Sequence, residues 1–85
     1  MEYQIEIKLS ARKAILALSK DLQQRMYDAI NKLAEQPRPS GVVKLSGEHD
    51  LYRVRIGEYR ILYEIHDNRV LVLVVKVGHR SDIYH

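Results

Sequence analysis

Arginines gather around one short stretch of the chain, at Arg53, Arg55 and Arg60. Side chains alternate across a strand, and a two-residue turn that begins with glycine is a favoured hairpin connection. If residues 57–58 form such a turn, Arg55 faces Arg60 across a hairpin. Arg53 then lies on the same side, opposite Leu62. Guanidinium groups match phosphate oxygens and keep their charge at any working pH, so this face is suited to binding an anion such as phosphate.

The other face of the same hairpin is apolar, and its residues are Tyr52, Val54, Ile56, Tyr59, Ile61 and Tyr63. Like charges directly opposite one another destabilise a sheet, with pair energies of roughly 0.2–1 kcal/mol. The predicted Arg55–Arg60 pair therefore needs a compensating interaction. A bound anion supplies it in one interpretation. In the other, the arginines extend into water or are neutralised by Glu64 on the same face.

The C-terminal residues 78–85 add an imidazole, a guanidinium and a phenol at His79, Arg80 and Tyr84. If this segment folds back beside the hairpin, Arg80 and Tyr84 join the arginines around one phosphate. Tyr84 would then stack on a base or move a proton. Alternatively, Tyr84 closes the edge of the core and Arg80 is solvated, and the spacing alone leaves both interpretations open.

A strand and two helices precede the hairpin. Apolar and polar residues alternate over residues 3–9, which is the period of a half-buried strand. Ser10 and Ser19 are each suited to cap a helix, and Pro37 and Pro39 end the second one. Apolar residues at helical spacing form the predicted core stripe: Ala11, Ala14, Ile15, Leu18, Leu22, Met26, Ala29, Ile30 and Leu33.

The remainder is typical of a β-meander, with a short strand at residues 42–45, the arginine hairpin, a turn at 67–68 and a last strand at 69–78. The near-continuous β-branched run in that last strand predicts cover on both of its faces. We therefore predict an α+β fold: an N-terminal strand, two helices, then a mostly antiparallel meander, with the helices packed on one side of the sheet. At 85 residues, the chain is predicted to be a single domain over residues 1–85.

Composition excludes several classes of chemistry. The chain has no cysteine, so it has no disulfide, catalytic thiolate or thiolate metal site. Its four histidines fall in separate loops or ends and its glycines are scattered, so we expect neither a metal nor a cofactor.

The N-terminus lacks the pattern of a signal peptide, and the longest apolar run, residues 70–75, is far below the roughly 20 residues that span a bilayer. We expect a cytoplasmic protein without a membrane partner. Its net charge of +3 favours an anionic partner.

Three blocks of sequence together resemble the RelE branch of the RelE/ParE toxin superfamily: LSG at residues 45–47, YRVRIGEYRILY at 52–63 and VGHRSDIY at 77–84. The resemblance implies a RelE-like fold and the toxin of a type II toxin-antitoxin system. Such a toxin is a ribosome-dependent endoribonuclease, an mRNA interferase that cleaves messenger RNA in the ribosomal A site without metal or cofactor. In these enzymes the ribose 2′-hydroxyl attacks the adjacent phosphate. The implied partners are a cognate, RelB-like antitoxin, the ribosome and mRNA, with promoter DNA contacted only through the antitoxin.

The resemblance also implies roles for individual residues. Arg53 and Arg55 occupy positions where the family carries basic, often lysine, side chains that contact the RNA backbone and assist proton transfer. Arg60 and Arg80 match arginines that steady the scissile phosphate, and Tyr84 matches a tyrosine that stacks on the substrate base.

This chain differs from the family in the residues that are available for proton transfer, because it has arginine at positions 53 and 55. An arginine is a poor general base because its pKa lies above about 12. We therefore expect the arginines mainly to stabilise the charge that develops on the phosphate. His79 or Tyr84 is expected to handle protons, since histidine titrates near neutral pH and a cluster of cations can lower the pKa of a tyrosine.

Two other functions fit parts of the pattern. A ParE-type toxin inhibits DNA gyrase by binding it and would share the fold and the Tyr-Arg-Ile-x-Tyr hairpin at residues 59–63. An inactive relative would bind only RNA or the antitoxin. The extra basic residues of the hairpin and the segment from Arg80 to Tyr84 favour the RelE branch.

Overall fold

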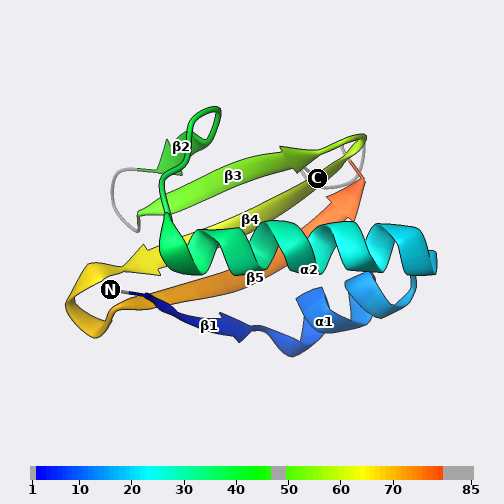
Figure 1. Ribbon diagram of the computed structural model, residues 1–85, viewed down its shortest axis with the longest axis horizontal. Helices are drawn as coiled ribbons and strands as arrows, with labels where there is room; N and C mark the ends of the chain where they lie inside the picture. The colour runs from blue at the N-terminus through cyan, green and yellow to red at the C-terminus, as the bar shows by residue number, and fades with distance from the viewer. Residues whose placement is uncertain (1, 47–49, 80–85) are drawn as a thin grey trace.

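The computed structural model describes residues 2–46 and 50–79. Within these residues, two helices and five strands follow one another (Figure 1). They are β1 (Gln4–Ile7), α1 (Leu9–Leu16), α2 (Lys20–Glu35), β2 (Val43–Ser46), β3 (Leu51–Ile56), β4 (Tyr59–His66), a 3-10 turn (Asp67–Arg69) and β5 (Leu71–His79). The predicted order of strand, helix, helix and meander is therefore confirmed.

The strands form one sheet in the order β1-β5-β4-β3-β2. β1 pairs with β5 in parallel, and the other three pairings are antiparallel. Both helices cover the same face of the sheet, as predicted, with α2 running across its middle (Figure 1). We refer to the uncovered side as the open face.

The core lies between the helices and the sheet. Its fully or nearly fully buried residues are Ala11, Ile15, Met26, Ile30, Leu33, Tyr52, Ile61, Tyr63, Ile65, Val72, Val74 and Val77. Those in α1 and α2 belong to the stripe predicted from helical spacing. Those in β3 and β4 lie on the apolar side of the hairpin, so the sequence pattern identified the core face of the central strands correctly.

The beginning of α1 differs from the prediction. Ser10 lies inside the helix, Lys8 precedes its first residue, and no side chain caps it. The expected strand also ends two residues early, because Leu9 starts the helix and is 66% exposed. The reason is that Lys8 takes part in both elements: its amide donates a hydrogen bond to Val74 O at 2.9 Å, and its carbonyl oxygen accepts one from the Arg12 amide at 2.9 Å. The chain therefore passes from strand to helix without a linker. At α2 the expected cap is confirmed, since Ser19 accepts a hydrogen bond from the Leu22 amide.

The prediction that the last strand is covered on both of its faces is confirmed only at the beginning of β5. Leu71 and Val72 point to opposite faces and are both buried. Further along β5, Val75 is half-buried and Lys76 is exposed. Both helices lie on the other side, so the open face is less covered toward the C-terminal end of β5. None of the helices within residues 2–46 and 50–79 is long and apolar enough to cross a membrane.

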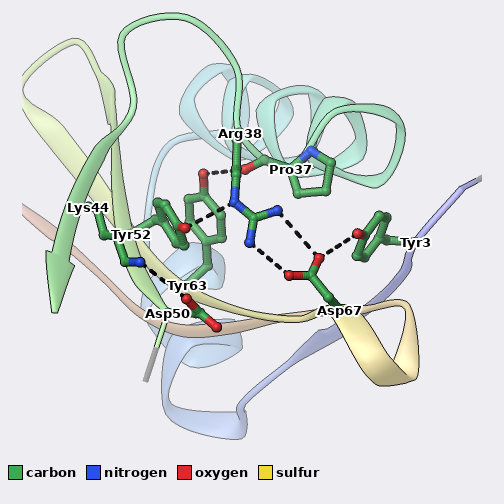
Figure 2. A network of polar contacts seen from close by, with 8 residues as sticks. All are labelled: Tyr3, Pro37, Arg38, Lys44, Asp50, Tyr52, Tyr63 and Asp67. Atoms are coloured by element: carbon green, nitrogen blue, oxygen red, sulfur yellow. Dashed lines mark hydrogen bonds and ion pairs between the residues drawn. The ribbon is translucent and has the colours of Figure 1, made fainter. Parts of the chain in front are cut away.

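One polar network joins the N-terminus to the end of the sheet that lies far from the arginine hairpin turn (Figure 2). The Arg38 guanidinium donates to both oxygens of Asp67, at 3.3 and 2.9 Å, and its Nε donates to the Tyr52 hydroxyl at 2.9 Å. Tyr3 donates to the same Asp67 carboxylate at 2.6 Å. The network thus connects the segment before β1, the loop after α2, β3 and the turn before β5.

Two stacked, buried tyrosines, Tyr52 and Tyr63, lie against the loop after α2. The Tyr63 hydroxyl donates to the Pro37 carbonyl oxygen at 2.7 Å, and the Tyr63 ring stacks on Tyr52 with 5.8 Å between centroids. Tyr63 has no exposed surface, and burial raises the pKa of its hydroxyl above the usual range. It therefore remains a neutral donor, and the loop after α2 is held against β4.

Stability should decrease in acid because of Asp67. The Arg38 hydrogen bonds, followed by that from Tyr3, lower the pKa of Asp67 below its ordinary value of 3.8. The charged network therefore contributes stability above about pH 3.8, and this contribution is lost as the pH falls through the lower folded-state pKa. We expect the free energy of unfolding of the wild type to exceed that of Asp67→Asn at neutral pH, with the difference shrinking toward pH 2. Asp28→Asn, on the exposed side of α2, is the matched control. A difference that stays constant with pH would contradict this role for Asp67.

Candidate functional site

The arginine hairpin has the register predicted from its sequence. Across β3 and β4, Arg55 pairs with Arg60 and Arg53 pairs with Leu62. The turn begins at Gly57, whose φ is +60°, and Glu58 does not share this left-handed backbone. A two-residue hairpin loop with glycine in first place has this geometry in a type II′ turn. The glycine thus fixes which residues of the two strands face each other.

All three arginines of the hairpin lie on the open face. Strand neighbours of the arginines, such as Tyr52 and Ile61, point into the core. Arg55 is exposed, whereas Arg53 and Arg60 are half-buried. Half-burial restricts where these guanidinium groups can reach, so they are held in place more firmly than freely solvated side chains. Because positive charge concentrates on one sheet surface, this surface is suited to an anionic chain such as RNA.

β5 adds a further cation, which the sequence prediction did not include. Lys76 pairs with Leu62 on β4, so it lies on the open face in the same row as Arg53. Arg55, Arg60 and Gly78 form the neighbouring row. We call Arg53, Arg55, Arg60 and Lys76 the cationic patch. The signal that could have identified Lys76 is its charge within an otherwise apolar run.

A β-bulge places Lys76 there. Tyr63 pairs with Val74 but Leu62 pairs with Lys76, so Val75 is an extra residue in β5. Without the bulge Lys76 would pair with Ile61 and point into the core, where an unpaired ammonium is costly. Bulges re-aim side chains in this way and are common beside functional sites.

Glu64 also lies on the open face, further along β4. Its Oε1 is 2.9 Å from Nε2 of His66, two residues along on the same face. In register, Glu64 pairs with Leu51 and Leu73 rather than with a member of the cationic patch. The acidic side chain is therefore placed toward the opposite end of the sheet from the Arg55–Arg60 pair.

His79 does not share the open face. It pairs with Tyr59, one residue beyond the pairing of Gly78 with Arg60, so strand alternation turns it to the other side. Its ring meets the Tyr59 ring edge-on, with 5.5 Å between centroids and 86° between planes. His79 is thus at the end of the sheet beside the cationic patch, but not within it. Arg80 and Tyr84 lie outside the described residues.

In the part of the chain that the structure describes, no group of three or more histidine, aspartate and glutamate side chains is arranged to hold a metal ion. The four side chains of the cationic patch offer guanidinium and ammonium donors. Such donors bind phosphate oxygens, and guanidinium groups can do so bidentately. The patch can therefore position a phosphodiester and stabilise added negative charge on it.

The hairpin turn should control both stability and site geometry. A side chain at Gly57 would meet Arg25 only at ordinary contact distance, 3.6 Å, so the penalty of Gly57→Ala comes from the positive φ. We expect a loss of about 1–2 kcal/mol in the free energy of unfolding. Gly41, at φ +88° with open space around it, is the matched control, because Gly41→Ala strains the backbone away from the hairpin. Both variants should lose stability in denaturant titrations. Only Gly57→Ala should also change the affinity of the cationic patch for RNA. Equal binding by both would argue against control by the turn.

Comparison with known proteins agrees with this geometry. The family model described as ParE toxin of type II toxin-antitoxin system, parDE, matches residues 5–84. The chain belongs to this toxin family. Within it the similarity is to RelE-like toxins, so the fold and family inferred from the three sequence blocks are confirmed.

Individual relatives cover almost the whole toxin. A RelE-like toxin protein of Escherichia coli is 33% identical over 99% of this chain and 92% of its own length. The mRNA interferase toxin RelE of Escherichia coli strain K12 is 28% identical over the same shares of the two chains. In structure, the toxin resembles a chain of the archaeal RelE-RelB complex from Pyrococcus horikoshii, with a TM-score of 0.86 and 30% identity over 96% of this chain and 99% of that one.

Proposed function

We propose that this RelE-like toxin is an endoribonuclease that cleaves mRNA in the ribosomal A site and so inhibits translation. The cationic patch is the observation that carries the proposal, because it gathers phosphate-binding side chains from β3, β4 and β5 on one uncovered sheet surface. The name of the Escherichia coli relative, mRNA interferase toxin RelE, supports the same reaction.

The proposed reaction is attack of the ribose 2′-hydroxyl on the adjacent phosphorus. The new bond from the 2′-oxygen to phosphorus replaces the bond to the 5′-oxygen, and the upstream fragment ends in a 2′,3′-cyclic phosphate. Negative charge on the phosphate oxygens rises in the transition state. Arg60, paired with Arg55 in the middle of the patch, stabilises that charge, and Arg53 extends the contact along the RNA backbone.

The remaining predicted residues complete the proposal. Arg80 assists Arg60 at the scissile phosphate, and Tyr84 stacks on the substrate base. His79 or Tyr84 takes the proton of the 2′-hydroxyl. For His79 this requires access around the end of the sheet, since it lies on the Tyr59 side.

Ribosome dependence follows from what the patch can recognise. Guanidinium and ammonium groups on a sheet surface contact phosphates, which are the same in every sequence. Another partner must therefore hold the mRNA and present one particular phosphate. We propose that the ribosome does this, and that the reaction needs no metal or cofactor from the toxin.

The toxin is further proposed to act with a cognate antitoxin. The relative from Pyrococcus horikoshii was solved as a RelE-RelB complex, and the Escherichia coli relative as an intact RelBE toxin-antitoxin complex. A RelB-like antitoxin would neutralise this toxin by covering the cationic patch. Promoter DNA would be contacted through the antitoxin, and the toxin would act in the cytoplasm.

The family model favours a second candidate, because its description names the ParE toxin of parDE systems. A ParE-type toxin would inhibit DNA gyrase and would need no phosphate chemistry of its own. Gyrase cleavage-complex assays with the purified toxin separate the two functions. Accumulated cleavage complexes together with intact mRNA would favour the gyrase inhibitor.

A single 2′-deoxy substitution tests the proposed chemistry. Ribosomes programmed with an mRNA that lacks the 2′-hydroxyl at the scissile nucleotide should protect that bond completely, because the nucleophile is missing. The same substitution one nucleotide upstream is the control and should leave cleavage unchanged. Cleavage of the deoxy bond would contradict attack by the 2′-oxygen.

A further inference from the structure

Lys76 differs from the other members of the cationic patch in what it can do with its proton. An arginine stays protonated at any working pH, whereas a lysine can give up a proton and take it back. Lys76 is exposed on the open face and pairs with Leu62, which itself pairs with Arg53. It therefore places an ammonium group beside the guanidinium groups of the patch.

The register also brings Lys76 close to Arg60. Gly78, which pairs with Arg60, is two residues further along β5 on the same face, so Lys76 is the diagonal neighbour of Arg60. Diagonal neighbours in an antiparallel sheet lie about 7–8 Å apart, within reach of long side chains. One phosphodiester can therefore contact the Arg60 guanidinium and the Lys76 ammonium together.

We propose that Lys76 is a catalytic residue that protonates the leaving 5′-oxygen. The inference rests on the proposed nuclease function. As the 2′-oxygen bonds to phosphorus, the bond between phosphorus and the 5′-oxygen breaks and its electron pair stays on that oxygen. The Lys76 ammonium transfers a proton there, leaving a neutral amine and a 5′-hydroxyl. The proton of the 2′-hydroxyl goes to the general base of the proposed function.

The bulge in β5 supports a specific role for Lys76, rather than the interpretation that Lys76 is simply solvated. A regular β5 would turn residue 76 into the core, and the extra residue Val75 turns it instead toward the arginines. Two of the arginines, Arg53 and Arg60, already bring fixed positive charge to this surface. A proton donor is what they cannot supply, and general acid catalysis typically contributes about 10²–10⁴-fold to a rate.

The test compares Lys76→Arg and Lys76→Ala with the wild type in single-turnover cleavage on programmed ribosomes. Two mRNAs are used, one ordinary and one with sulfur in place of the bridging 5′-oxygen, because a thiolate leaves without being protonated. Both variants should cleave the ordinary mRNA at least about 10²-fold more slowly than the wild type. Both should cleave the sulfur-containing mRNA at the wild-type rate. Lys32→Ala, on α2 and away from the open face, is the control for loss of a lysine.

Several results would overturn the proposal. A wild-type rate for Lys76→Arg on the ordinary mRNA would show that only positive charge is needed, and equal losses on both mRNAs would show that leaving-group protonation is not involved. Binding to ribosomes carrying the 2′-deoxy mRNA should be unchanged in both variants, and weaker binding that accounts for the loss would make Lys76 a binding residue. If the wild-type toxin itself cleaves neither mRNA, the proposed nuclease function fails as well.

Discussion

Replacement of Arg60 by alanine is expected to lower single-turnover cleavage on programmed ribosomes by about 10²–10³-fold, the usual loss when one donor to a developing anion is removed. Arg60 is half-buried on β4, with Arg55 beside it on β3. It is thus a preorganised cation at the centre of the cationic patch. Rapid-quench measurements at saturating toxin would report the chemical step.

Two matched variants define what the Arg60 result means. Arg69→Ala removes an exposed arginine from the 3-10 turn at the other end of β4 and should leave the rate unchanged. Arg60→Lys keeps the charge but loses the bidentate fork, so it should restore only part of the rate. Binding to the antitoxin should survive Arg60→Ala. Wild-type cleavage by Arg60→Ala would remove the patch from the mechanism.

Ile61→Ala should cause one of the largest losses of stability in the chain, about 2–5 kcal/mol in the free energy of unfolding. Ile61 has no exposed surface and pairs with Val54 on one side and Val77 on the other. Truncation leaves a cavity between the sheet and the helices. Denaturant titration followed by circular dichroism would measure the change.

Leu62→Ala is the natural control, because it lies at the next position of β4 on the opposite face and is only half-buried. It should lose clearly less stability than Ile61→Ala, since part of its side chain is already in water. Equal losses at the two positions would contradict the assignment of the core face. A difference in this direction would confirm that the arginines lie on the solvent side.

Local sequence rules were sufficient for the hairpin. Gly57 fixed the turn, the turn fixed the pairing of Arg55 with Arg60, and alternation then placed the arginines opposite the core. The same rules predicted the helices, their apolar stripe and the cap at Ser19, because each depends on residues within one or two turns.

The features that could not be predicted depend on partners far away in the sequence. Helix α1 begins at Leu9 rather than after Ser10, because Lys8 is the last residue that bonds to β5, through Val74, and its carbonyl oxygen already accepts from the Arg12 amide. The bulge at Val75 places Lys76 on the open face and sends His79 to the Tyr59 side. No rule based on alternation within a single strand contains that bulge, so neither the position of Lys76 nor the face of the sheet on which His79 lies could be predicted.

The most direct test of the account is cleavage of a defined mRNA by purified toxin with and without programmed ribosomes, mapped by primer extension for the wild type and Arg60→Ala. We predict cuts within the codon in the A site, only when ribosomes are present and only with the wild type. Intact mRNA under both conditions would contradict the account, and so would equal cutting by Arg60→Ala.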